Sequence, residues 1–329
     1  MTCMNLKVIV ALALLGSTGL AIANPGQQIH MEWLNTVSLA AHQTNYSGTF
    51  VHQYGNQLET SNISHIFDHS GERTKVEKQD GSECEVTSNN SAVWCYSSDK
   101  VGQAERAHDR KVFPVLLPEQ LSALGENYQI RTGESARIAG FDTQVLELRP
   151  RDNLRYSHKM WVHKDSGLLL KAAVLSDRQE VVEQYTFIQL KINSSIKLTK
   201  APPSVIPQTT AQPGSPLAQK IVAVTDESAW KVDGIPAGFK KIAEMRRSMR
   251  GKKSMATQMV FSDGLVGISI FIEARPSNSD SALGLSSQGA IHIYSKFNGD
   301  YLVTVVGEVP PGTVLQIADS VRNRGLLSN

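Results

Sequence analysis

Few residues in this chain have the types and spacing that catalysis requires. Ser97 and Ser194 are each followed three residues later by a lysine, at Lys100 and Lys197, which is the S-x-x-K spacing of serine acyltransferases. The S-D-N and K-T-G sequences that complete such an active site are absent from the chain. No G-x-S-x-G, P-loop, G-x-G-x-x-G or C-x-x-C motif is present either. The sequence therefore predicts that the protein is not an enzyme and requires no cofactor.

The histidines do not have the spacing of metal ligands. His65 and His69 are four residues apart, but the surrounding pattern predicts a strand that ends before His69. Ligation at this spacing requires a helix. His158 and His163 are five residues apart on a predicted strand, so their side chains point to opposite faces. We therefore predict no metal site.

Two cysteines, Cys84 and Cys95, flank a segment that contains Asn89 and Asn90. Asparagine tolerates a positive φ, so Asn89-Asn90 predicts a two-residue hairpin turn. With that turn, Cys84 would lie directly opposite Cys95, where a disulfide is sterically possible in an oxidising compartment. The alternative is a redox or metal site, although two thiols without an adjacent histidine supply only half of the ligands.

A basic segment extends from residue 240 to residue 253 and contains seven basic residues and one acidic residue, Glu244. The basic residues are Lys240, Lys241, Arg246, Arg247, Arg250, Lys252 and Lys253. Ile242, Met245 and Met249 are interleaved at helical spacing. One interpretation is a solvated face beside a core helix. The other is a surface that binds an anionic partner, either an acidic protein segment or the phosphates of a lipid headgroup.

The first residues predict an export signal. Lys7 precedes an apolar run from Val8 to Leu15, and the small residues Ala21 and Ala23 form a cleavage site before Asn24. We expect a soluble exported protein, located in the periplasm if the source is a Gram-negative bacterium. A nucleic acid partner is not expected for an exported chain.

A proline-rich stretch divides the remaining chain into two predicted domains. Residues 201–216 lack apolar periodicity and hold five of the 13 prolines, which is typical of an extended linker. A long ordered surface loop is the alternative. With residues 1–23 as the signal peptide, we predict a first domain over 24–198, a linker over 199–219 and a second domain over 220–329.

Alternating apolar and polar residues predict an antiparallel sheet in the first domain, most clearly over 141–192. Alternation groups the following side chains on one face of their strand: Met160 with Val162, Leu168 with Leu170, and Ile188 with Leu190 and Ile192. Tyr185 and Phe187 would point the other way. Alternation alone does not show which face looks inward.

Two helices are predicted beside this sheet, over residues 31–41 and 113–124, where Pro118 suits the first turn of the second helix. Their buried sides would consist of Leu34 and Val37 in the first helix, and of Leu117, Leu121 and Leu124 in the second. The predicted fold class is therefore α+β, mainly antiparallel β, in which helices fill or plug a curved sheet.

The second domain is predicted to be a smaller antiparallel sheet with one or two helices. Its strands are expected at 255–261, 265–274, 290–297 and 301–307, and Asn298-Gly299 is a hairpin signal. Thr313 and Gln316 form a capping box, which predicts a last helix that buries Val314, Ile317 and Val321.

Five segments of these domains are long enough to be distinctive. They are YSGTFV at 46–51, FPVLLPEQL at 113–121, RDNLRYSHKMWVHKDSGLLLK at 151–171, FSDGLVGISIFIE at 261–273 and VTVVGEVP at 303–310. Together they resemble the RseB and MucB family, periplasmic negative regulators of the sigma-E (AlgU-type) envelope stress response. The resemblance runs in order from about residue 46 to residue 321 and so covers both predicted domains.

The resemblance implies a first domain similar to the lipoprotein carriers LolA and LolB, which are unclosed β-barrels with helices in the mouth. It implies binding to the periplasmic region of an RseA- or MucA-like membrane anti-sigma factor, protection of that factor from proteolysis, and release by lipopolysaccharide or another acyl-chain ligand. The alternative function is a periplasmic lipoprotein carrier. A homo-oligomer is left open.

On this interpretation, one face of the first sheet lines a lipid cavity, and the opposite face is the alternative. The candidate lining residues are Leu34, Phe50, Leu117, Leu121, Met160, Val162, Leu168, Leu170 and Ile188. The seven basic residues of the basic segment are the candidate contacts to the anti-sigma factor.

Overall fold

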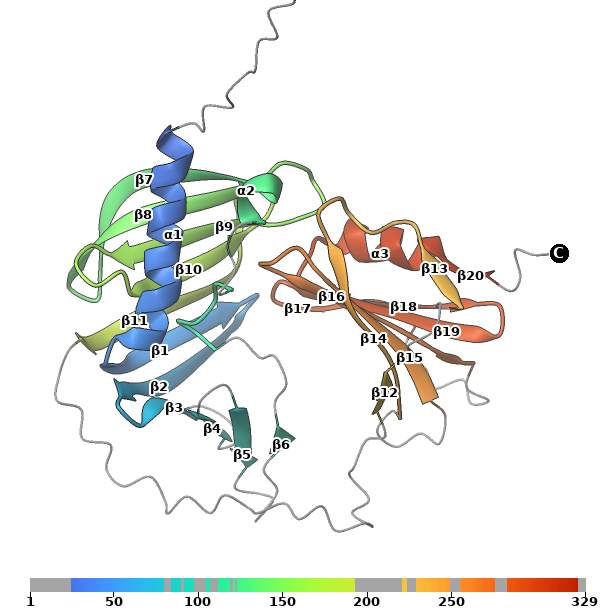
Figure 1. The fold of residues 1–329 in the computed structure, drawn as a ribbon, viewed down its shortest axis with the longest axis horizontal. Helices are drawn as coiled ribbons and strands as arrows, with labels where there is room; N and C mark the ends of the chain where they lie inside the picture. The colour runs from blue at the N-terminus through green and yellow to red at the C-terminus, as the bar shows by residue number, and fades with distance from the viewer. Residues whose placement is uncertain are drawn as a thin grey trace, which may run out of the picture.

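The computed structural model describes residues 25–79, 84–89, 92–97, 105–106, 112–118, 121, 123–192, 221–223, 229–248, 255–275 and 283–324. Within these ranges the chain forms two parts, each built on its own antiparallel sheet (Figure 1). None of the helices in the described ranges is both long and apolar enough to span a bilayer.

The first sheet contains eleven strands in the order β6-β5-β4-β3-β2-β1-β11-β10-β9-β8-β7. Their bounds are β1 (Tyr46–Tyr54), β2 (Gln57–Asp68), β3 (Gly71–Lys78), β4 (Cys84–Asn89), β5 (Ala92–Ser97), β6 (Glu105–Arg106), β7 (Tyr128–Ile138), β8 (Phe141–Pro150), β9 (Ser157–His163), β10 (Leu169–Leu175) and β11 (Val181–Ile192). At its middle, β1 pairs with β11, and Tyr46 lies opposite Ile192. The two end strands do not pair with each other, so the sheet is not closed, as predicted for this fold class.

Helix α1 (Pro25–Gln43) crosses the curved face of this sheet (Figure 1), which we call the inner face. The helix predicted over 31–41 is therefore confirmed, and it is longer than predicted. Leu34 and Val37 are buried as expected, and a leucine buried so completely stabilises the fold by about 2 kcal/mol. The turn after β9 packs closely on the helix, because a Cβ at Gly167 (φ +74°) would lie 2.6 Å from Thr36 Cγ2. Glycine is therefore required at this turn.

The helix predicted within 113–124, with Pro118 in its first turn, is wrong for the described residues of this stretch before Leu124. Where the structure describes this stretch, residues 112–118 are irregular and the helical residues belong to α2 (Leu124–Asn127). Prolines remove backbone donors, and the segment instead forms tight turns in which Val115 N–H donates to the carbonyl of Val112. Its predicted buried side is nevertheless buried, at Leu117, Leu121 and Leu124.

The second sheet contains seven strands in the order β12-β14-β15-β16-β19-β18-β17. Their bounds are β12 (Ile221–Ala223), β14 (Lys240–Ser248), β15 (Met255–Ser262), β16 (Gly267–Ala274), β17 (Gly284–Gln288), β18 (Ile291–Asn298) and β19 (Tyr301–Gly307). A separate pair consists of β13 (Trp230–Val232) and β20 (Val321–Asn323). Helix α3 (Pro311–Ser320) lies against β18 and β19. The predicted β18–β19 hairpin is confirmed, with Gly299 at φ +59° in its turn.

The last helix is confirmed, but its capping box is wrong. The helix begins at Pro311, two residues before Thr313, and no side chain caps its first turn. Thr313 Oγ1 instead donates to the carbonyl of Leu154 in the first part, at 3.1 Å. Proline at the first helical position needs no hydrogen-bond acceptor, which explains the earlier start.

The two parts meet around a buried ion pair. Arg155 Nε donates to Asp263 Oδ2 at 2.7 Å, and both side chains are almost fully buried. Tyr128 Oη donates to the same oxygen at 3.1 Å, and the Arg155 guanidinium lies 4.7 Å from the centre of the Phe239 ring. Gly238 packs so closely on Asn127 that a Cβ there would overlap its side chain. The two parts are therefore held together by specific polar contacts as well as by apolar packing.

Candidate functional site

Most of the candidate cavity residues are buried in the hydrophobic core. Eight of the nine lie in one hydrophobic cluster, and none of these eight is more than 6% exposed. They are Leu34, Phe50, Leu117, Leu121, Met160, Val162, Leu168 and Leu170. The face that contains Met160 and Val162 is therefore the inner face.

Ile188 is the exception, because its side chain is 53% exposed. The strand register shifts between Thr49 and Phe50, which pair with Gln189 and Phe187, so that Ile188 has no partner on β1. Such a β-bulge adds one residue to a strand and breaks its alternation. Phe187 therefore points inward and is 1% exposed. The predicted grouping of Ile188 with Leu190 and Ile192, with Phe187 on the opposite face, is wrong at this bulge.

Phe113 fills the middle of the inner face. Its ring centre lies 5.2 Å from that of Phe50, 5.0 Å from that of Phe187 and 5.4 Å from that of Tyr185. The segment that carries it is also tied to helix α1, because Ser38 Oγ donates to the carbonyl of Pro118. Phe113 was not predicted as a site residue from the sequence. The available signal was the pair Tyr185 and Phe187, which share one face of a strand and so offer an aromatic surface for a third ring. A ligand on this face would have to displace the segment 112–118.

A polar cluster ties the end of helix α1 to the first sheet. Glu72 on β3 accepts hydrogen bonds from His42 at 2.9 Å and from His65 at 3.2 Å. His65 is fully buried, stacks on the ring of Tyr46, and contacts the carbonyl of Thr44 at 2.8 Å. Burial alone would raise the pKa of Glu72, but the hydrogen bonds from His42 and His65 bring it down to about 2.

This low pKa predicts that the cluster loses its stabilising effect in acid. A carboxylate with a depressed pKa stabilises the fold fully above its ordinary pKa of 4.5, and the contribution disappears as the pH falls toward 2. The difference in unfolding free energy between the native chain and Glu72→Gln should therefore shrink across this interval. Urea titrations of both proteins at neutral pH and near pH 2 measure this difference. An equal difference at the two pH values would contradict a depressed pKa for Glu72.

The basic segment is a strand where the structure describes it, so its helical spacing is misleading. Arg250, Lys252 and Lys253 lie outside the described residues. Strand β14 pairs with β12 on one side and with β15 on the other, and a bulge at Ile242 leaves that side chain 65% exposed. Alternation and the bulge place Lys241 and Arg246 on one face of the strand, and Lys240 and Arg247 on the other.

The charges on β14 differ in their surroundings. Lys240, Lys241 and Arg246 are exposed, whereas Arg247 is half-buried and donates to Gln258 Oε1 at 3.0 Å. Lys241 forms an ion pair with Glu244 at 2.7 Å. An exposed isoleucine among exposed cations is suited to binding a segment that is both acidic and apolar.

The predicted register of the cysteine hairpin is wrong. Asn89 pairs with Ala92, so Cys84 lies opposite Ser97 and Cys95 lies opposite Val86. The two cysteines are therefore diagonal neighbours instead of direct partners. A disulfide between them stays a prediction.

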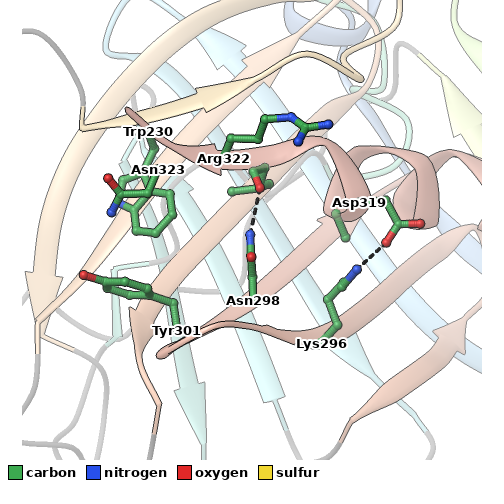
Figure 2. Close-up of a pocket in the computed structure, with 9 residues that line it drawn as sticks. Trp230, Lys296, Asn298, Tyr301, Asp319, Arg322 and Asn323 are labelled. Atoms are coloured by element: carbon green, nitrogen blue, oxygen red, sulfur yellow. Dashed lines mark hydrogen bonds and ion pairs between the residues drawn. The ribbon is translucent and has the colours of Figure 1, made fainter. Parts of the chain in front are cut away.

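A pocket in the second part was not predicted from the sequence. It lies between β13, β20, the end of α3 and the β18–β19 hairpin (Figure 2). The Trp230 ring stands edge-on to that of Tyr301 at 4.7 Å, and Asn298 Nδ2 donates to the carbonyl of Val321 at 2.7 Å. Among the residues that the structure describes, no three His, Cys, Asp or Glu side chains here or elsewhere are arranged to hold a metal ion.

Comparison with known protein families finds matches in both parts of the chain. The model described as the MucB/RseB N-terminal domain matches residues 30–205, and the model described as the MucB/RseB C-terminal domain matches residues 224–322.

Individual relatives agree with these models. The chain is 29% identical to the sigma factor AlgU regulatory protein MucB of Pseudomonas aeruginosa over 298 residues, which are 88% of this chain and 90% of the relative. It is 26% identical to the sigma-E factor regulatory protein RseB of Escherichia coli (strain K12) over 212 residues, 64% of each chain. A solved complex of Pseudomonas aeruginosa MucA and MucB matches with a TM-score of 0.67 and 26% identity, and covers 90% of this chain and 99% of that one.

Proposed function

Because the chain belongs to the MucB/RseB family, we propose that it is a negative regulator of an envelope stress sigma factor and acts by binding the periplasmic region of a membrane anti-sigma factor. The observation that carries the proposal is the similarity, over 90% of this chain, to a MucB that was solved in complex with MucA. Named relatives that regulate AlgU and sigma-E support it. The periplasm is the compartment that this function requires.

The exposed basic strand β14 is the proposed contact surface. Lys241 and Arg246 share one face of the strand and would attract acidic residues of the partner there. Lys240 would do so from the end of the strand, and Ile242 would give the complex an apolar contact. Exposed charges mainly accelerate association, whereas a buried apolar contact slows dissociation.

Replacing Lys240, Lys241 and Arg246 by alanine together is expected to weaken binding on the order of tenfold or more, mainly through slower association. Surface plasmon resonance with an immobilised anti-sigma periplasmic region measures both rates. The matched control removes the same number of positive charges elsewhere, at the exposed lysines Lys78, Lys164 and Lys231, and should leave the affinity within about twofold. Equal losses in both variants would exclude β14 as the contact surface.

The proposed consequence of binding is that the anti-sigma factor is shielded from its protease. A lipid ligand would release this protection only if it bound one state of the protein more tightly than the other. The proposed entry point is the inner face, where the ligand would displace the segment that carries Phe113. Lipopolysaccharide titrated into the complex should then dissociate it, and a complex that survives saturating lipid would exclude this mode of release.

A further inference from the structure

The outer face of the first sheet carries a tryptophan between two ammonium groups. Met160 and Val162 point inward, so Trp161 between them points outward. Lys171 lies opposite Trp161 on β10, and its Nζ is 4.8 Å from the centre of the indole ring. Lys159 is two residues before Trp161 on the same strand, and its Nζ is 5.4 Å from that centre.

Positive charge is in excess around this tryptophan. Arg131, Glu147 and Lys159 lie side by side on β7, β8 and β9, and Arg149 is beside them on β8. Glu147 is shared between Arg149, at 2.7 Å, and Lys159, at 3.3 Å. On this part of the face, the single carboxylate of Glu147 therefore faces three cations, and Lys171 adds a fourth.

Lys171 is the cation that these contacts leave without compensation. Among the residues that the structure describes, no carboxylate forms an ion pair with it. Its partial burial, together with repulsion from Lys159, lowers the pKa of its ammonium group. Two like charges held against one ring are unfavourable in isolation, and an anion between them would relieve the repulsion.

Apolar side chains continue the same surface. Val181 is 53% exposed and lies opposite Leu175, and Ile188 is 53% exposed at the bulge of the same strand. An indole ring, long lysine side chains and exposed aliphatic groups on one face are the combination found where proteins meet the boundary between headgroups and acyl chains.

We propose that the outer face formed by Arg131, Arg149, Lys159, Trp161 and Lys171 docks the protein on a bilayer that presents anionic phosphate headgroups. Charge complementarity identifies this occupant, because the four cations face outward across four neighbouring strands and so suit a layer of phosphates.

Co-sedimentation with vesicles tests the proposal. The full-length mature chain should bind phosphatidylcholine vesicles that contain phosphatidylglycerol, should bind pure phosphatidylcholine vesicles much less, and should dissociate in high salt. Replacing Lys159 and Lys171 by glutamine together should weaken binding on the order of tenfold. The control double variant, Lys78→Gln with Lys231→Gln, removes the same charge elsewhere and should bind as the native chain does.

A second measurement keeps the test independent of folding. Brominated lipids should quench part of the tryptophan fluorescence in the native chain, and Trp161→Phe should lose that part while keeping the native melting temperature. Equal binding by the glutamine and control variants, or equal quenching with and without Trp161, would overturn the proposal. Competition by inorganic phosphate at low concentration would also overturn it, because it would indicate a site for the free ion. If the Lys159→Gln, Lys171→Gln variant lost binding to the anti-sigma periplasmic region but bound vesicles as the native chain does, the face would be assigned to an acidic protein partner instead.

Discussion

Replacing Asp263 by alanine is expected to lower the free energy of unfolding by about 3 to 5 kcal/mol. Arg155 is buried against it, and without this carboxylate the guanidinium would keep only Asp152, which is partly exposed, as a charged partner. The other carboxylate oxygen of Asp263 accepts the backbone N–H groups of Leu265 and Val266, at 2.9 and 3.0 Å, so the variant also loses the shape of this turn.

Chemical denaturation followed by tryptophan fluorescence measures this loss. Asp263→Asn keeps the size of the side chain and one acceptor oxygen, so its loss should be smaller than that of the alanine variant. Asp300→Ala removes a carboxylate from an exposed turn of the same sheet and should change the stability by less than about 0.5 kcal/mol. A loss below about 1 kcal/mol for Asp263→Ala would mean that the ion pair does not hold the two parts together.

Replacing Phe113 by alanine is expected to destabilise the protein by about 3 to 5 kcal/mol and to open a cavity on the inner face of the first sheet. The ring is 2% exposed and contacts three other aromatic rings, so its removal leaves a space lined by apolar groups. An apolar space of this kind stays dry and accepts apolar ligands.

A fluorescent fatty acid should therefore bind the Phe113→Ala variant more tightly than the native chain. The gain in binding free energy should match the free energy that the native chain needs to displace the Phe113 ring. Phe67→Ala is the matched control, since that phenylalanine is 44% exposed and its loss should change stability and binding little. Weaker binding of the fatty acid by Phe113→Ala would show that the ring contacts the ligand instead of occupying its place.

Local pattern predicted the strands better than it predicted which side chains they expose. Alternation correctly grouped Met160 with Val162, but at Ile188 a bulge inserts one residue and breaks the predicted grouping, and a second bulge, at Ile242, exposes that side chain. A bulge depends on the register with the neighbouring strand, and that register is a long-range property. The spacing of apolar residues along one strand therefore cannot predict this register.

The misleading helical spacing at 240–248 and the missing helical turns at 113–118 have different physical causes. Residues 240–248 are rich in good helix formers, but pairing with β12 and β15 satisfies their backbone on both sides and outweighs that weak preference. In residues 113–118 the two prolines remove backbone donors, and the buried side chains hold the segment in place without a helix. The contact between Arg155 and Asp263 could not be predicted, because nothing local to either residue identifies its partner.

The pairing of β1 with β11 has a consequence for how the chain acquires its fold. Tyr46 and Ile192 are direct partners, so the centre of the first sheet joins its earliest strand to its last. Such distant pairing makes folding slow, because a long loop must close before the contact forms. Until β11 pairs with β1 and β10, both strands have an unpaired edge to which a strand of another chain can bind. A nascent or truncated chain that ends before residue 181 is thus exposed to aggregation at the position that later becomes the middle of the sheet.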